Sequence, residues 1–308
     1  MDEGMLRFDD RAILVTGAGR GLGRAHAMLL ASRGAKVLVA DNGAAMDGGG
    51  GADGPAQEVV AAISAAGGTA VAYTADLSQE KGSHGAVAAT LDAFGRIDGI
   101  LHNASTVPEL MPPDLLSTAD LDSVLRVNVY AALWMVRTAW PHFVANRHGR
   151  IVLTSSAGIF GAEGNMSYCA AKAAVLGIMR CLAVEGRAHG IHVNVIAPSA
   201  STRMTERFLA DDYARWFHQA MPPEQVAAAA AWLLHEACGV NGEILALGGG
   251  RIGRIVLGEN DGVLHAGRSI EDAAKALPQV LQEGSFFYPA SLAERSARVM
   301  GMFAAPGG

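Results

Sequence analysis

The sequence predicts an α/β protein in which helices cover both faces of a doubly wound sheet of seven parallel strands. Short β-branched runs alternate with long alanine-rich segments through most of the chain, and such alternation is typical of crossover units between parallel strands. Several runs, such as Ala12–Thr16, are apolar almost throughout, which indicates strands covered on both faces. A chain of 308 residues, half of them apolar, is long enough to form one large unit of this kind.

The expected elements follow this alternation along the chain. Strands are expected at Ala12–Thr16, Lys36–Asp41, Thr69–Thr74, Gly99–Asn103, Arg150–Ser155, His192–Pro198 and Glu243–Leu247. Helices are expected between them at Gly21–Arg33, Pro55–Ala66, Gln79–Phe94, Thr118–Asn146, Tyr168–His189 and Pro223–His235. Residues 1–250 are therefore predicted to form a single domain. Residues 251–308 carry no assignable motif beyond the helix-compatible Ile270–Leu281, so we expect an extension that packs on the domain or is exchanged between subunits, not an independent domain.

Two segments interrupt the alternation. Asn42–Gly54 holds four consecutive glycines and few apolar residues, so we expect a mobile loop beside the place where a nucleotide would lie. Ser199–Pro222 follows the sixth strand and mixes aromatic with polar residues. The carboxyl ends of parallel strands form the ligand edge of an open sheet, so this segment either contacts substrate or forms a short helix packed on the domain.

Composition and charge argue against several classes of protein. The formal net charge is −6 and the basic residues form no run, so nucleic acid is not an expected partner. Met1–Asp10 carries four acidic residues and no apolar core, and no stretch reaches the length expected of a membrane span. We therefore expect a cytoplasmic protein without membrane contact. The three cysteines are odd in number and widely spaced, which predicts neither a disulfide framework nor a bound metal.

A glycine-rich loop directly follows the first strand and opens the first helix. It contains Gly17, Arg20, Gly21, Leu22 and Gly23. Glycines let the backbone approach a pyrophosphate closely, and a helix amino terminus offers free N–H groups and partial positive charge. The alternative is an ordinary strand-to-helix turn, but the position between an apolar strand and a long helix favours a dinucleotide site.

Two acidic residues follow the second and third strands. Asp41 lies where the general dinucleotide fold places a carboxylate against the adenosine ribose, and it would repel a 2′-phosphate, so NAD is predicted in preference to NADP. Arg20 argues for NADP, the alternative, because a guanidinium can pair with that phosphate. Asp76 could bind the adenine amino group; its alternative role is a helix cap, for which Ser78 is the better candidate.

Tyr168 and Lys172 form the predicted catalytic pair. Their four-residue separation puts both side chains on one face of a helix. A phenol titrates near about pH 10, and an adjacent ammonium favours the phenolate, so Lys172 is expected to lower the pKa of Tyr168. Ser155 lies thirteen residues before Tyr168, at the end of the fifth strand, where its hydroxyl could hold a substrate oxygen. Ser156 is its competitor, because only one of two successive strand residues faces the site.

Over about residues 8–250 the sequence resembles the short-chain dehydrogenase/reductase family. The motifs that carry this resemblance are, in order, the glycine motif Thr16–Gly23, Asp76, Asn103-Ala104, Asn128, Ser155, Tyr168 and Lys172. The resemblance implies a Rossmann-type fold, a secondary alcohol or ketone as substrate, and a tetrad of Asn128, Ser155, Tyr168 and Lys172, in which Asn128 holds a water on a proton relay. It implies cofactor contacts from Gly17, Arg20, Gly21, Leu22, Gly23, Asp41, Asp76, Leu77, Asn103, Ala104, Tyr168, Lys172, Pro198 and Thr202.

Two loops depart from the family pattern. The family's Asn-Asn-Ala-Gly is here His102-Asn-Ala-Ser105, so a glycine that usually lies against the cofactor carries a side chain, and the nicotinamide pocket is expected to be slightly reshaped. The usual Pro-Gly is Pro198-Ser199, which leaves the carboxamide contacts of this loop open.

Further segments resemble the (3R)-hydroxyacyl-CoA dehydrogenase unit of peroxisomal multifunctional enzymes, namely Ala183–Arg187, Ile191–Asn194, Ile196–Pro198, Arg203–Thr205, Trp232–Glu236, Arg251–Gly253 and the glycine-rich insertion after Asp41. This likeness suggests an acyl-CoA or steroid-like substrate, and the family likeness a homodimer or homotetramer. The alternatives are reduction of 3-oxoacyl carrier protein or another ketone with NADP, and a non-catalytic NAD-binding sensor or scaffold.

Overall fold

The chain folds around one mostly parallel sheet, which confirms the predicted fold class. The computed structural model describes residues 4–51, 54–206, 211–264, 269–282 and 284–304. The sheet has the strand order β3-β2-β1-β4-β5-β6-β7-β8, and all pairings from β3 to β7 are parallel. The strands are β1 Ala12–Thr16, β2 Lys36–Ala40, β3 Thr69–Tyr73, β4 Gly99–His102, β5 Gly149–Thr154, β6 Ile191–Pro198, β7 Ile244–Gly248 and β8 Arg251–Ile255. The order reverses between β1 and β4, and a crevice at such a switch point is where open parallel sheets bind ligands.

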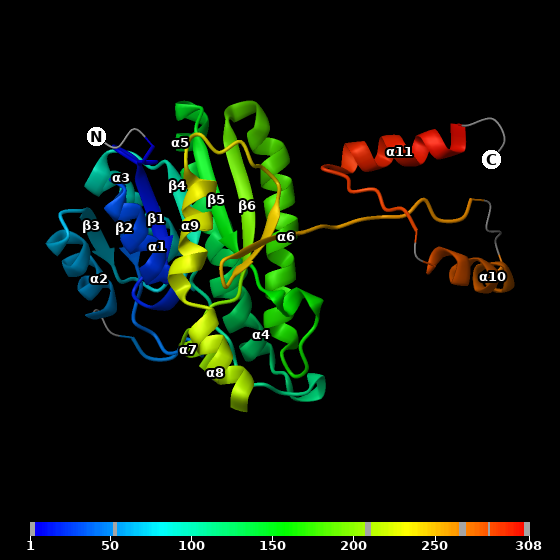
Figure 1. The fold of residues 1–308 in the computed structure, drawn as a ribbon, viewed down its shortest axis with the longest axis horizontal. Coiled ribbons are helices and arrows are strands. Elements are labelled where there is room, and N and C mark those ends of the chain that lie inside the picture. Colours follow the sequence, from blue (N-terminus) through cyan, green and yellow to red (C-terminus); the bar gives the residue numbers. More distant parts are fainter. Residues whose placement is uncertain (1–3, 52–53, 207–210, 265–268, 283, 305–308) are drawn as a thin grey trace. The chain divides into compact units, whose positions relative to one another are not determined.

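Helices cover both faces of the sheet (Figure 1). One layer contains α1 (Gly21–Ser32), α2 (Gly54–Ala65) and α9 (Pro223–Leu234), and the other contains α3 (Glu80–Phe94), α4 (Thr118–Leu125), α5 (Ala131–Asn146) and α6 (Met166–Gly186). The core lies between these layers because β1, β4 and β5 are buried along their whole length. Burying both faces of such strands is the main stabilising contribution of the fold.

The predicted count of seven strands is wrong, because β8 adds an eighth at the edge of the sheet. Gly249 and Gly250 link β7 to β8, and both have positive φ angles, 57° and 74°. Two successive residues of this kind make the tight turn of a β-hairpin. The sequence signal was weak because β8 is an exposed or half-buried edge strand that includes Arg251 and Arg254, not an apolar run.

The predicted helix Thr118–Asn146 is interrupted. Between α4 and α5, Arg126–Tyr130 forms a π-helical turn, in which the Ala131 N–H donates to the Arg126 carbonyl five residues back. Such turns occur mainly at functional sites in proteins. A second difference concerns the helix Met166–His189, which by length and composition could cross a membrane, contrary to the sequence expectation. It packs against β5 and β6.

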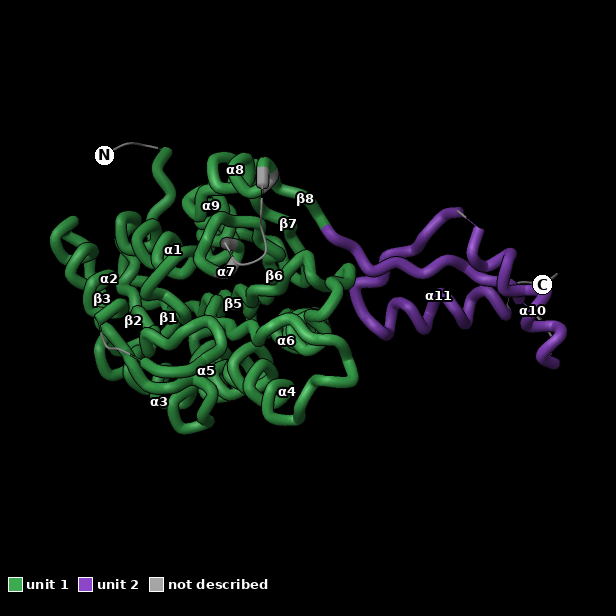
Figure 2. Tube along the Cα trace, turned by 90° about the horizontal axis from the view of Figure 1, so that it is seen from below, with its two compact units in different colours: residues 1–254 green, residues 255–308 purple. Residues whose placement is uncertain are grey.

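The chain forms two compact units, Met1–Arg254 and Ile255–Gly308 (Figure 2). The second unit contains α10 (Ile270–Val280), α11 (Leu292–Ala304) and an antiparallel bridge between Glu259 and Phe287. Arg295 pairs with Glu259 in this unit, at 2.7 Å. Among its described apolar residues only Ala276 is buried, so the unit has little core of its own. The expected packing of this extension on the domain stays a prediction.

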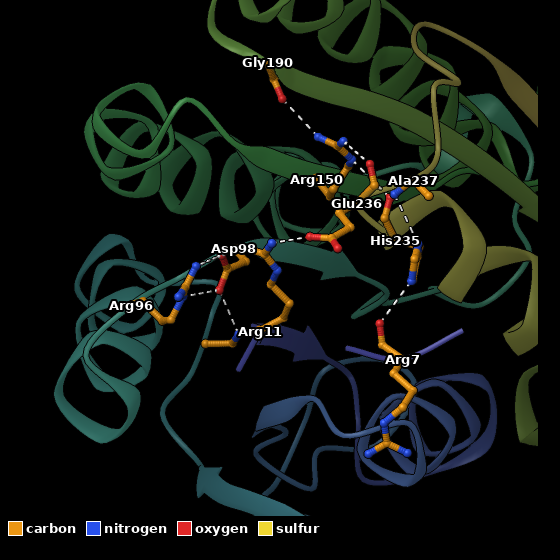
Figure 3. Close-up of polar contacts among 10 residues, drawn as sticks. Arg7, Arg11, Arg96, Asp98, Arg150, Gly190, His235, Glu236 and Ala237 are labelled. Atoms are coloured by element: carbon orange, nitrogen blue, oxygen red, sulfur yellow. Dashed lines mark hydrogen bonds and ion pairs between the residues drawn. The ribbon is translucent and has the colours of Figure 1, made fainter. Parts of the chain in front are cut away.

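A cluster of charged residues joins the amino ends of the strands, on the opposite side from the ligand edge (Figure 3). The Asp98 carboxylate accepts two hydrogen bonds from Arg96, at 2.6 and 2.7 Å, and one from the Ala12 backbone N–H at 2.9 Å. Burial raises the pKa of Asp98, but these bonds and the charges of Arg96 and Arg11 hold it below its usual value. Arg150 donates to the carbonyls of Gly190 and Glu236, so the cluster ties β1, β4, β5 and the end of α9 together.

Candidate active site

A cavity of about 800 Å³ opens at the carboxyl edge of the sheet. It is lined by residues that follow β1, β2, β3, β4, β5 and β6, which lie far apart in the sequence. The predicted site residues that line it are Gly17, Arg20, Gly21, Leu22, Asp41, Asp76, Leu77, Asn103, Ala104, Ser155, Tyr168, Lys172, Pro198 and Thr202. Gly23 and Asn128 are not among its lining residues, since both are buried behind it. A cavity of this size, with polar groups converging on it, is typical of a small-molecule site.

The glycine-rich loop fits a pyrophosphate. Gly17 and Gly21 have φ angles of 61° and 51°, which favour glycine, and α1 begins at Gly21 with its N–H groups at the cavity. A Cβ atom at Gly23 would lie 1.9 Å from the Gly17 carbonyl oxygen, so the tight turn requires glycine there. The loop therefore has the backbone geometry that a phosphate-binding turn needs, and the cofactor contact expected of Gly23 stays a prediction.

Asp41 lies at the end of β2 and binds the glycine loop. Its carboxylate accepts from the backbone N–H groups of Gly19 and Gly43, both at 2.8 Å. The loop after it folds back, because the Met46 carbonyl accepts from the Val107 N–H at 2.9 Å. Residues 44–48 therefore line the cavity, and a carboxylate stands at the ribose end of the predicted nucleotide site.

Asp76 lines the same end of the cavity as Asp41. Its carboxylate accepts from the Ser78 backbone N–H at 2.8 Å and from the Ser78 hydroxyl at 2.7 Å. Ser78 is not the helix cap that the alternative interpretation required, because α3 begins after Gln79. Asp76 is exposed enough to accept a further hydrogen bond from a ligand.

Tyr168 and Lys172 lie together on α6, as their spacing predicted. The Lys172 Nζ is 5.4 Å from the centre of the Tyr168 ring and donates to the Thr154 carbonyl at 2.9 Å. Burial lowers the pKa of Lys172 to about 7. Burial also raises the pKa of Tyr168, and a hydrogen bond with Ser156 opposes this only in part. The pKa of Tyr168 is therefore raised, contrary to the net lowering expected beside Lys172, because desolvation of the phenolate has the largest effect.

The two serines that follow β5 have different hydrogen-bond partners. The Ser155 hydroxyl is buried and donates to the Lys172 backbone carbonyl at 2.7 Å. The Ser156 hydroxyl accepts from the Gly158 N–H at 3.0 Å and acts to lower the pKa of Tyr168, against the effect of burial. Ser155, which its spacing and the family resemblance predict, and its competitor Ser156 both line the cavity, and which of the two holds a substrate oxygen stays a prediction.

Asn128 occupies the centre of the π turn and is fully buried. Its Nδ2 donates to the carbonyls of Val124, at 2.9 Å, and Thr106, at 3.3 Å. Its Oδ1 accepts from the Ser105 hydroxyl at 2.6 Å. The turn packs against α6, so Asn128 lies beneath the helix that carries Tyr168.

The segment after β6 contributes one side of the cavity. It forms α7 (Arg203–Glu206) and α8 (Asp211–Ala220), and Thr202, Arg203 and Thr205 line the cavity. Phe217 of α8 is buried, which supports packing for that aromatic residue, whereas Trp216 is half exposed. Phe208 lies outside the described residues. Substrate contact therefore stays a prediction for the residues at the start of this segment that line the cavity, Thr202, Arg203 and Thr205.

Several cavity residues had no sequence signal. Asp122, Ser123 and Arg126 come from α4 and the π turn, and Thr154 comes from the last position of β5. Only the tertiary fold brings these residues to the cavity, because none belongs to a motif. Among the described residues, no group of three histidine, cysteine, aspartate or glutamate side chains could hold a metal ion. Cys169, Cys181 and Cys238 are free thiols.

The family profile and the related sequences agree with one another. The profile of the family described as short chain dehydrogenase matches residues 11–212. The chain is 44% identical over 252 residues to peroxisomal multifunctional enzyme type 2 of Mus musculus, which covers 81% of this chain and 33% of that enzyme. It is 41% identical over 254 residues to a short-chain type dehydrogenase/reductase of Mycobacterium tuberculosis, covering 82% of this chain and 87% of that protein.

A solved structure extends the likeness to the whole fold. Full-length peroxisomal multifunctional enzyme type 2 from Drosophila melanogaster superposes with a TM-score of 0.79 and 27% identity, covering 96% of this chain and 50% of that one. The chain thus spans about a third of the length of the mouse enzyme and half of the fly enzyme.

Proposed function

Because this chain belongs to the short chain dehydrogenase family, we propose that it is an NAD-dependent oxidoreductase in which Tyr168 exchanges the proton with a secondary alcohol or ketone. The observation that carries this assignment is the position of Tyr168 at the cavity, with the Nζ of buried Lys172 5.4 Å from its ring centre. General acid–base catalysis requires a titratable group at hydrogen-bond distance from the reacting oxygen, and Tyr168 is placed to supply it.

The residues present fit a nicotinamide dinucleotide. The Gly17–Gly23 loop offers helical N–H groups to the pyrophosphate, and Asp41 and Asp76 stand at the adenosine end. When bound, the dinucleotide accepts or returns the hydride of the reaction. We assign NAD over NADP because the Asp41 carboxylate, fixed by two backbone N–H groups, would face the 2′-phosphate with like charge. Arg20 also lines the cavity and is the residue that would favour NADP.

The chain's own residues handle the proton. In oxidation the Tyr168 phenolate takes the hydroxyl proton of the substrate, while the carbon-bound hydrogen leaves with both electrons as hydride; in reduction the phenol returns the proton. The Ser156 hydroxyl donates to the substrate oxygen as negative charge develops there. The Lys172 ammonium, when protonated, stabilises the phenolate.

The substrate class proposed is a 3-hydroxyacyl-CoA or a steroid-like alcohol. The support is the likeness to the dehydrogenase-bearing multifunctional enzymes and a cavity large enough for an acyl chain or a fused ring system. Initial rates with an acyl-CoA, a steroid and a sugar alcohol, each with NAD and with NADP, would assign substrate and cofactor together. Higher rates with a sugar alcohol or with NADP would overturn this part of the proposal. A homodimer or homotetramer in the cytoplasm remains the accompanying proposal.

Replacing Tyr168 by phenylalanine tests the proton donor. Loss of a positioned general acid or base costs about 10² to 10⁴ in rate, so Tyr168→Phe should nearly abolish turnover while NAD binding, followed by fluorescence titration, is retained. Tyr130→Phe is the matched control, since Tyr130 is exposed and its ring lies tilted against that of Trp134, and neither residue lines the cavity. Wild-type turnover in Tyr168→Phe would refute the assignment.

A further inference from the structure

Two side chains that replace the usual family residues, His102 at the end of β4 and Ser105 in the loop after it, both bind the π turn Arg126–Tyr130. The His102 Nε2 lies 3.0 Å from the Val127 carbonyl oxygen. The Ser105 hydroxyl donates to the Asn128 Oδ1 at 2.6 Å. Successive residues of the turn are therefore held by side chains from one short segment.

The hydrogen bonds define which nitrogen of His102 carries the proton. The Val127 carbonyl can only accept, so the Nε2 donates, and the Nδ1, 2.9 Å from the Thr16 Oγ1, accepts the threonine proton. The Thr16 oxygen in turn accepts from the backbone N–H groups of Asn103 and Ala104, both at 3.1 Å. Burial and the charge of Lys172 lower the pKa of His102 to about 3, so the ring is neutral. The imidazole thus connects the end of β1 to the π turn.

The Asn128 amide makes three hydrogen bonds inside the protein. Both of its Nδ2 bonds go to backbone carbonyls, of Val124 and Thr106, and its Oδ1 is met by Ser105. A π turn interrupts the regular hydrogen-bond pattern of an α-helix. Here the carbonyls of Val124 and Val127 are met by Asn128 and His102.

We propose that His102 and Ser105 are positioning residues that hold the π turn, and with it Asn128, beneath the helix carrying Tyr168 and Lys172. Neither side chain is assigned a bond to the reacting atoms. Their contribution to turnover rests on the proposed function, whereas their effect on the turn does not depend on it.

The structural arm of the test is hydrogen–deuterium exchange of residues 118–131 in the full chain. Ser105→Ala removes one bond to Asn128, and His102→Phe keeps a ring while removing both of its polar contacts. Both variants should exchange faster than wild type in this segment. His26→Phe is the matched control: His26 is also fully buried, but it lies on α1 and neither ring nitrogen has a hydrogen-bond partner in the described structure. Unchanged exchange in Ser105→Ala and His102→Phe would overturn the proposal, whether or not the enzyme turns over.

The kinetic arm is a double-mutant cycle with Asn128→Ala. Alone, Ser105→Ala and His102→Phe should lower kcat by about fivefold to tenfold, the effect of one lost buried hydrogen bond on a positioned group. In the Asn128→Ala background the same changes should cost less than about twofold, because they act through Asn128. If the effects of the single changes on kcat add fully in the double mutants, action through Asn128 is refuted. The control His26→Phe should leave kcat unchanged. If wild type turns over no alcohol or ketone, the proposed function fails, while the exchange result still decides the positioning role.

Discussion

The assignment of the catalytic serine gives the sharpest prediction, because Ser155 and Ser156 are adjacent and serve as controls for one another. Ser156→Ala removes the hydroxyl beside Tyr168. Loss of one preorganised donor to a developing oxyanion costs about 10² to 10³ in kcat, or about 3–4 kcal/mol of barrier. Ser155→Ala removes a hydroxyl that donates to the Lys172 carbonyl, whose loss costs about 1 kcal/mol of stability and little of the chemistry.

The assay is steady-state kcat and KM for both variants with the best alcohol substrate, together with NAD affinity and the midpoint of thermal unfolding. We expect Ser156→Ala to lose turnover at nearly unchanged NAD affinity. We expect Ser155→Ala to unfold at a lower temperature and to keep most of its turnover. The reverse order of kcat values, with both proteins folded and binding NAD, would show that Ser155, and not Ser156, holds the substrate oxygen.

Three further predictions follow from the charges of the site and the core. Asp41→Ser should raise kcat/KM with NADP relative to NAD by at least about tenfold, because a like charge no longer opposes the 2′-phosphate; an unchanged ratio would contradict the role of Asp41. Lys172→Met should shift the pH at which alcohol oxidation is half-maximal upward, since loss of the nearby positive charge raises the pKa of Tyr168; an unmoved profile of kcat/KM against pH would contradict this. Burial lowers the pKa of His26 from 6.5 to about 4, so the unfolded chain takes up the proton first as the pH falls. The contribution of His26 to the free energy of unfolding is therefore fully present above about pH 6.5, and it falls by about 3 kcal/mol as the pH drops to 4. Urea unfolding over this range should show less acid destabilisation in His26→Leu than in wild type.

Much of the fold was predictable because its signals are local. The runs of β1, β4 and β5 are apolar because both of their faces are covered, and that property is visible in any short window of sequence. The glycine loop was predictable for a similar reason, because the requirement is local. A Cβ atom at Gly23 would lie only 1.9 Å from the Gly17 carbonyl oxygen, so this position admits no side chain. The exposed edge strand β8 lacked such a signal and was missed.

The chemistry of the site was predictable only in part. The spacing of Tyr168 and Lys172 determines that they share a helix face, and the structure places them together as expected. The effect of Lys172 on the phenol was not predictable from spacing, because the pKa values depend on how much water each group loses.

By itself, the sequence determined the order of strands and helices, the phosphate loop and the tyrosine–lysine pair, since each depends on residues within a few positions of one another. Only the tertiary structure decided that Asn128 sits in a π turn and that His102 and Ser105 bind this turn. The bonds of His102 and Ser105 join segments that are 25 and 23 residues apart. Their geometry depends on where the strands end and how the helices pack, which no local pattern records.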